Sequence, residues 1–248
     1  MDNLKQMEEI SATMSTSDDN SMTYMAIKAN SYLEAIVRKL KKDGKSVATA
    51  ESCTGGSLSA RITSVNGASE VFSLGVCTYT DEQKNKVLGV RKQDLENYSA
   101  VSSIVAVQMA QRILRKSNAD YAIATTGYAG PSGGTPQDPV GTVYIAVATK
   151  DKVFVRRYYF SGDRGEITFK AVYRAFELLV NVLDGTVNIE KTAIIHYEKE
   201  GEQGEDYQQK LQTFSQFMKG NTDSNIMLLL GMLMILLNQN NKENNGEK

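Results

Sequence analysis

Residues 47–62 read VATAESCTGGSLSARI, and this stretch decides the fold class. Val47–Ala50 is a short run of small and β-branched residues, which predicts a buried strand. A Gly-Gly pair follows, and Leu58 and Ile62 then lie four positions apart, the spacing of one helix face. A strand that passes through a glycine turn into a helix is typical of open α/β sheets, whose ligands bind at the carboxyl ends of the strands.

The rest of the chain alternates helices and strands around this unit. Apolar residues at helical spacing predict helices over residues 26–42, 81–88 and 164–183, with a further long helix capped by Ser102. Alternating apolar residues predict strands over residues 71–80, 121–126, 142–148 and 153–160, the last two forming a hairpin. The pattern predicts an α/β fold, a three-layer α/β/α sandwich with a mixed sheet.

A length of 248 residues allows one good-sized domain with tails. Residues 1–25 are polar and are expected to form a mobile extension before a domain over residues 26–186. Residues 187–248 form an acidic tail that contains an apolar run at 226–237. A bilayer span needs about 17–25 residues, so this run is too short to cross a membrane. A buried or self-associating helix and a membrane-surface anchor both remain open for it.

The charge is unevenly distributed along the chain. Residues 26–186 carry 21 basic and 15 acidic residues, whereas the two flanking segments are acidic. The longest basic cluster, Arg38–Lys42, has the pattern of a solvated helix end. It is too short to be the basic stripe that is typical of proteins that bind nucleic acid. A positive domain suits a small anionic ligand better than a nucleic acid, so we expect a small-molecule partner and no nucleic acid. We also expect a homo-oligomer, a dimer.

Histidine and cysteine usage narrows the chemistry. His196 is the only histidine and is expected to lie outside the domain, which excludes a Ser-His-Asp triad, a His-ligated zinc and a His base there. Cys53 and Cys77 are too few for a disulfide scaffold and fit a reducing compartment. Residues at the start lack the basic-then-apolar pattern of a secretory signal, so a cytoplasmic protein is predicted.

Three segments are candidates for the site. The turn at 51–56 places the hydroxyls of Ser52 and Thr54 beside the N–H groups at the start of a helix, although its glycines could equally serve tight packing. The loop at 127–141 holds all three prolines and five glycines, which indicates a fixed path rather than a linker. Lys84 follows the strand at 71–80 and, taken alone, has the pattern of a surface lysine.

Several motifs in order resemble one family. They are AESCTGG (50–56), TYTDEQK (78–84), LGV (88–90), AVS (100–102), TGYAGPSGGTP (126–136), PVGTVYIA (139–146) and FSGDR (160–164). Together they resemble the CinA C-terminal domain family, the nicotinamide-nucleotide amidases, from about Lys45 to Leu183. The resemblance implies an α/β/α sandwich that hydrolyses the carboxamide of nicotinamide mononucleotide to nicotinate mononucleotide and ammonia, without metal or cofactor.

The resemblance also implies roles for individual residues. The family's serine nucleophile, lysine base and tyrosine fall on Ser52, Lys84 and Tyr79. With no histidine nearby a neutral lysine is the expected base, which requires a lowered Lys84 pKa. The expected substrate-binding residues, including oxyanion donors around 54–56 and phosphate ligands in the loop and at Arg164, are Thr54, Gly55, Gly56, Thr126, Gly127, Gly130, Gly133, Gly134 and Arg164.

Two alternatives stay open. Cys53 adjoins Ser52 and is the more reactive group, but neighbouring residues near a strand end point to opposite faces, and the resemblance favours Ser52. The family often has asparagine at the position of Asp81 and arginine at that of Thr168. These differences and the unmatched tail motivate a second hypothesis, a non-catalytic nucleotide-binding or assembly protein that keeps the pocket.

Overall fold

The computed structural model describes residues 22–189 and 191–196. Its helices are α2 (Met22–Asp43), α3 (Ser57–Thr63), α4 (Asp81–Gln83), α5 (Lys92–Tyr98), α6 (Ser103–Ser117) and α7 (Arg164–Asp184), with a 3-10 turn η1 (Ala68–Glu70) and a π-helical turn η2 (Lys84–Leu88). Its strands are β1 (Val47–Glu51), β2 (Phe72–Cys77), β3 (Tyr121–Gly127), β4 (Thr142–Ala148), β5 (Lys152–Tyr159) and β6 (Ala193–His196).

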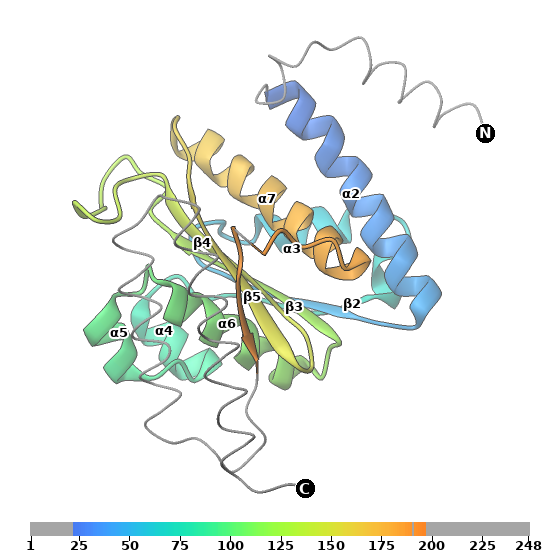
Figure 1. Ribbon diagram of the computed structural model, residues 1–248, viewed down its shortest axis with the longest axis horizontal. Helices are drawn as coiled ribbons and strands as arrows, with labels where there is room; N and C mark the ends of the chain where they lie inside the picture. Colours follow the sequence, from blue (N-terminus) through green and yellow to red (C-terminus); the bar gives the residue numbers. More distant parts are fainter. Residues whose placement is uncertain (1–21, 190, 197–248) are drawn as a thin grey trace, which may run out of the picture.

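The strands form one six-stranded sheet in the order β2-β1-β3-β4-β5-β6. β1 is parallel to β2 and β3, whereas β4, β5 and β6 are each antiparallel to the strand before them in this order. Helices cover both faces: α2, α3 and α7 lie on one side, and α4, α5 and α6 on the other (Figure 1). The predicted α/β/α sandwich with a mixed sheet is therefore confirmed.

The side chains of successive strand residues pack into two separate apolar cores, one on each face of the sheet. Val47 and Ile123 point to the side of α2, α3 and α7, where they join one buried apolar cluster. Ala48 and Ala50 point the other way and join a second cluster with α6. This alternation follows from the two-residue repeat of a strand. It also decides which side of β1 a residue just beyond its end will face.

The ends of the domain differ from the prediction. α2 begins at Met22 rather than at residue 26. Met25 is buried against Ala29 of the same helix and Tyr173 of α7. At the other end the sheet continues past residue 186, because β6 pairs with β5 and the backbone of His196 lies opposite Lys152. Four residues are too few to show a strand pattern in the sequence. The rest of the expected N-terminal extension and the apolar run at 226–237 lie outside the described residues.

The strand register separates the backbone of His196 from the carboxyl end of β1. Glu51, the last residue of β1, lies opposite Thr125 near the end of β3. His196 instead pairs with Lys152, at the end of β5 next to the β4–β5 turn, where the parallel strands begin. His196 was expected to lie outside the domain of residues 26–186. Its backbone belongs to β6 of the same sheet and lies at the end of the sheet opposite Ser52.

The helix predicted over 81–88 is present in two parts. α4 is a single turn that begins after Thr80, whose hydroxyl accepts a hydrogen bond from the N–H of Gln83. η2 then carries the chain from Lys84 to Leu88 and ends at Gly89, which has φ = 78°, a conformation that favours glycine. α5 was not predicted, since its seven residues are mostly polar.

Candidate active site

Ser52 and Lys84 meet at the carboxyl end of β1. Ser52 follows β1 directly, and its N–H donates to the carbonyl of Thr125 at 3.0 Å, which continues the ladder to β3. Lys84 is the first residue of η2, which follows β2 and α4 in the chain, and it is only 1% exposed. Its Nζ lies 3.1 Å from Ser52 Oγ. Two residues that are 32 positions apart in the chain thus form a direct hydrogen bond.

Two main-chain carbonyls complete the surroundings of the Lys84 amine. Nζ donates to the carbonyl oxygen of Thr78 at 3.0 Å and lies 3.3 Å from that of Tyr79. A neutral amine has two N–H donors and one lone pair, and two carbonyls can take both donors. The lone pair is then left for the third neighbour, the hydroxyl of Ser52. This arrangement can hold Lys84 as a proton acceptor for Ser52.

Burial lowers the pKa of Lys84 below its ordinary value. The charged ammonium loses its hydration inside the protein, and this effect outweighs the others. The carboxylate of Asp81 acts in the opposite direction, because a nearby negative charge favours the ammonium form. Burial therefore favours the neutral form of the Lys84 amine relative to that of a lysine in solvent.

Glu51 organises the turn that presents Ser52. Its fully buried carboxylate accepts hydrogen bonds from the hydroxyls of Thr54 and Ser59 and from the N–H groups of Gly56, Leu58 and Ser59, all at 2.7–3.0 Å. A carboxylate at the start of α3 satisfies helix N–H groups that have no partner within the helix. Sequence reasoning missed this role, because Glu51 ends β1 and lies six positions before the first residue of α3, so no local helix-start signal marks it.

The same contacts change the expected role of the glycine turn. The N–H of Gly56 donates to Glu51, and that of Gly55 donates to the carbonyl of Ser52 at 3.1 Å. The Thr54 hydroxyl is occupied by Glu51 and by Thr125. In this structure the N–H groups of Gly55 and Gly56 both donate within the protein, and their expected role as oxyanion donors stays a prediction.

Cys53 is directed into the apolar core. It belongs to the buried cluster beneath α2, α3 and α7, on the side of the sheet away from α6. Burial raises the pKa of its thiol to about 12. A thiolate is the nucleophilic form of cysteine, and the core environment opposes it. Of the two adjacent candidates, the structure places Ser52 rather than Cys53 against the lysine amine.

The side chains of Tyr79 and Arg164 lie at the rim of the candidate site, on the protein surface, and do not contact the hydroxyl of Ser52. The side chain of Tyr79 is 56% exposed, and its OH accepts a hydrogen bond from Arg164 Nη1 at 3.3 Å. Arg164 is the first residue of α7, which Asp163 caps by accepting from the N–H of Glu166. The contact joins the end of β2 to the start of α7. Tyr79 reaches Lys84 only through its main-chain carbonyl.

The glycine-rich loop has a fixed path that its own residues maintain. Thr126, at its start, donates to the carbonyl of Ala100. Gly134 has φ = 83°, and a Cβ there would lie 2.7 Å from the N atom of Val140, so a side chain has no room. Asp138 is buried and accepts from the hydroxyl of Tyr144 at 3.0 Å and from Nε of Arg157 at 2.9 Å. These contacts confirm a fixed path.

The remaining glycines of the loop also face protein atoms. A Cβ at Gly127 would lie 2.6 Å from the carbonyl oxygen of Thr142, and one at Gly130 would lie 2.7 Å from Val140. At Gly133 it would lie 3.1 Å from the ring of Tyr128. Close packing within the loop therefore explains all of these glycines. Their expected contact with a phosphate stays a prediction.

Two hollows in the described surface lie away from Ser52. One, of about 430 Å³, is lined by residues of the β4–β5 turn and the end of α7, including Lys150. The other, of about 780 Å³, lies beside α2 and includes Arg38. Neither hollow is lined by Ser52 or Lys84. The candidate site is therefore defined by the hydrogen-bonded pair of Ser52 and Lys84 rather than by either hollow.

Comparison with known proteins gives the family. The model of the CinA C-terminal domain matches residues 29–183, which is more than half of the chain. The chain belongs to the CinA C-terminal domain family. The match covers β1 to β5 with both residues of the Ser52–Lys84 pair and ends at the last turn of α7.

CinA proteins of several bacteria are similar in sequence. A competence-damage inducible protein of Thermoanaerobacter pseudethanolicus is 47% identical over 152 residues, which is 61% of this chain and 37% of that protein. A CinA-like protein of Thermotoga neapolitana is 45% identical over 146 residues, 59% of this chain and 36% of that protein. The match thus spans little more than a third of the length of these relatives.

Solved CinA structures share the fold. The competence/damage inducible protein CihA of Agrobacterium tumefaciens has a TM-score of 0.61 at 36% identity, covering 63% of this chain and 96% of that one. A CinA superfamily protein of Escherichia coli has a TM-score of 0.60 at 36% identity, covering 62% and 90%. Within the part of this CinA chain that the structure describes, no helix is long and apolar enough to cross a membrane.

Proposed function

We propose that this CinA domain is a serine amidase that hydrolyses the carboxamide of nicotinamide mononucleotide. The observation that carries the proposal is the Lys84 amine, 3.1 Å from Ser52 Oγ and flanked by the carbonyls of Thr78 and Tyr79. A buried lysine with a lowered pKa beside a serine hydroxyl is a base and nucleophile pair. The CinA family includes nicotinamide mononucleotide amidases, which supports the choice of substrate.

The first half-reaction uses both side chains. Neutral Lys84 takes the hydroxyl proton as Ser52 Oγ forms a bond to the carboxamide carbon. The tetrahedral intermediate collapses as the carbon–nitrogen bond breaks, and the lysine returns the proton to the departing nitrogen, which leaves as ammonia. The pyridinium charge of the substrate withdraws electrons from the carboxamide and eases the attack. The result is a nicotinoyl ester on Ser52.

The second half-reaction restores the enzyme. Lys84 now removes a proton from water, whose oxygen attacks the ester carbon, and the bond to Ser52 Oγ breaks. The serine takes the proton back, and nicotinate mononucleotide leaves as a carboxylate, its acid proton passing to water. Arg164 on the rim, beside Tyr79, is the proposed ligand of the substrate phosphate, because its guanidinium can pair with two phosphate oxygens.

The direct test is product formation by the purified chain. Incubated with nicotinamide mononucleotide, it is expected to release ammonia and nicotinate mononucleotide in equal amounts, measured by coupled ammonia assay and chromatography. If the nucleotide binds in a titration calorimeter but no ammonia forms, the amidase proposal fails. The alternative of a non-catalytic nucleotide-binding protein would then hold.

A change at Asp81 is expected to move the pH dependence. The Asp81 charge raises the pKa of Lys84, against the larger effect of burial. In Asp81→Asn that charge is lost, so the neutral amine forms at lower pH. Because the rate rises with pH as Lys84 loses its proton, the rising limb of kcat/KM should shift toward lower pH. An unchanged limb in initial-rate assays at low salt would show that Lys84 is not the titrating base.

A further inference from the structure

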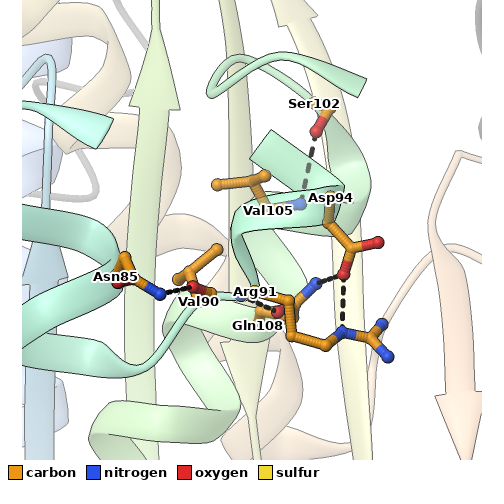
Figure 2. Close-up of polar contacts among 7 residues, drawn as sticks. All are labelled: Asn85, Val90, Arg91, Asp94, Ser102, Val105 and Gln108. Carbon is orange, nitrogen blue, oxygen red and sulfur yellow. Dashed lines mark hydrogen bonds and ion pairs between the residues drawn. The ribbon is translucent and has the colours of Figure 1, made fainter. Parts of the chain in front are cut away.

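A buried polar network ties the segment that carries Lys84 to α6 (Figure 2). Gln108 of α6 accepts a hydrogen bond from the main-chain N–H of Arg91 at 3.1 Å, and its amide donates to Asp94 at 2.6 Å. Gln108 and Asp94 are each only 4% exposed. The proposed reaction involves neither side chain. Burial of an amide and a carboxylate is costly unless they are paired, so their presence calls for a structural or functional reason.

The network reaches Lys84 through Val90. The N–H of Val90 donates to the carbonyl of Lys84 at 3.1 Å, and the Asn85 side chain donates to the carbonyl of Val90 at 2.8 Å (Figure 2 shows the second contact). Val90 is fully buried and directly precedes Arg91, whose N–H is held by Gln108. The main chain of Lys84 is therefore connected to α6 by consecutive hydrogen bonds.

Asp94 orients the amide of Gln108. A carboxylate only accepts hydrogen bonds, so the NH2 end of the amide must face it and the oxygen must face Arg91. The side chain of Arg91 supplies the balancing charge, with Nε 2.7 Å from the same Asp94 oxygen. The ion pair between Arg91 and Asp94, at the start of α5, thus determines that the Gln108 side chain presents its oxygen to the main-chain N–H of Arg91.

We propose that Gln108, oriented by Asp94, is a positioning residue for Lys84: it holds η2 so that Nζ stays between two carbonyls and the Ser52 hydroxyl. The inference rests on the proposed function for the role of Lys84 as the base. π-helical turns such as η2 are rare and less regularly bonded than α-helices, so an external anchor has a direct effect on their geometry. A displacement of about 1 Å at a reacting group can cost about 100-fold in rate.

Gln108→Met tests the proposal, because methionine keeps the length of the side chain but offers no amide. We expect kcat to fall by about 10- to 100-fold with KM little changed. The rising pH limb should move to higher pH, since a less enclosed Lys84 amine is easier to protonate. The other groups whose charge acts on this amine, Asp81, Cys53 and Cys77, are unaltered by the substitution.

A paired exchange and a control separate positioning from stability. Gln108→Glu alone sets two carboxylates together and should lower kcat, whereas Gln108→Glu with Asp94→Asn restores a donor facing an acceptor and should recover most of it. Asn30→Ala is the control, since it removes an amide contact to Arg61 on the other face of the sheet. If Gln108→Met and Asn30→Ala lower Tm alike and leave kcat and the pH limb unchanged, the role is structural and the inference is overturned.

A second readout does not depend on turnover. The ¹⁵N chemical shift of Lys84 Nζ, followed against pH in lysine-labelled protein and assigned with Lys84→Met, should titrate at higher pH in Gln108→Met than in the unmodified chain. A shifted titration in a chain that hydrolyses no nucleotide would refute the amidase and keep the positioning of Lys84. An unshifted titration in an active chain would refute the positioning role alone.

Discussion

Ser52→Ala is expected to lower amidase activity by at least about 1,000-fold, the size of effect seen when a serine nucleophile is removed. The reason is that, in the proposed mechanism, the hydroxyl supplies the atom that bonds to the carboxamide carbon. Ser52 is 7% exposed, and the hydrogen bond of its hydroxyl is to Lys84. Because alanine removes only this hydroxyl, the substitution should leave the fold intact. The measurement is ammonia release from nicotinamide mononucleotide at saturating substrate, with Tm recorded for both proteins.

The matched control lies at the next position. Cys53→Ala removes a thiol that is buried in the core and has a pKa raised to about 12, so it should lose some stability but keep most of its activity. Loss of activity in Cys53→Ala with retention in Ser52→Ala would reverse the assignment and identify a thiol hydrolase. Retention of activity in both variants would show that the hydrolysis proceeds without a covalent ester at this turn.

Lys84→Met is expected to lower kcat by about 100- to 10,000-fold, the range typical of a general base. Methionine fills a similar volume, and the substitution removes a buried amine whose pKa burial lowers, so little stability should be lost. The residual rate should lose the rising pH limb, because the group that titrates there is gone. Initial rates across pH, together with nucleotide binding by calorimetry, measure both effects.

Lys86→Met is the control for this substitution. Lys86 is two positions further along η2, is exposed and pairs with Glu82, so its substitution removes a lysine from the same segment whose amine lies in solvent. We expect its activity to stay within about twofold of the unmodified chain, as exposed ion pairs contribute little. An equal loss in both variants would mean that general positive charge, rather than the buried amine, supports the reaction.

Much of the fold could be predicted from local patterns. The helices over α2, α6 and α7 and the strands β1, β3, β4 and β5 follow from apolar patterns, because each of these elements buries one face or both. The strand β2 was also predicted, although none of its residues is fully buried. β6 was missed, because four residues carry no usable period, and α5, because polar residues dominate it. The boundary expected at residue 186 therefore cut through a sheet that continues to His196.

The candidate site was predictable in its residue types and not in its geometry. The motifs at Ser52 and Lys84 singled out both side chains, and Glu51 stood in the same motif without an assigned role. Its carboxylate accepts hydrogen bonds from the N–H of Gly56, one of the groups expected to bind a substrate oxyanion, and from those of Leu58 and Ser59. Such competition between two acceptors for one donor is not visible in a sequence.

The amino-acid order by itself determined the sandwich and the absence of histidine from the segment that carries the serine and lysine, because side-chain periodicity and composition are local properties. The resemblance of its motifs to one family singled out Ser52 and Lys84. Only the tertiary structure decided that Lys84 Nζ reaches Ser52, that Cys53 turns into the core, and that Gln108 accepts a hydrogen bond from the N–H of Arg91. These outcomes depend on hydrogen bonds and burial between distant segments, and their energies exist only once the strands and helices are packed together.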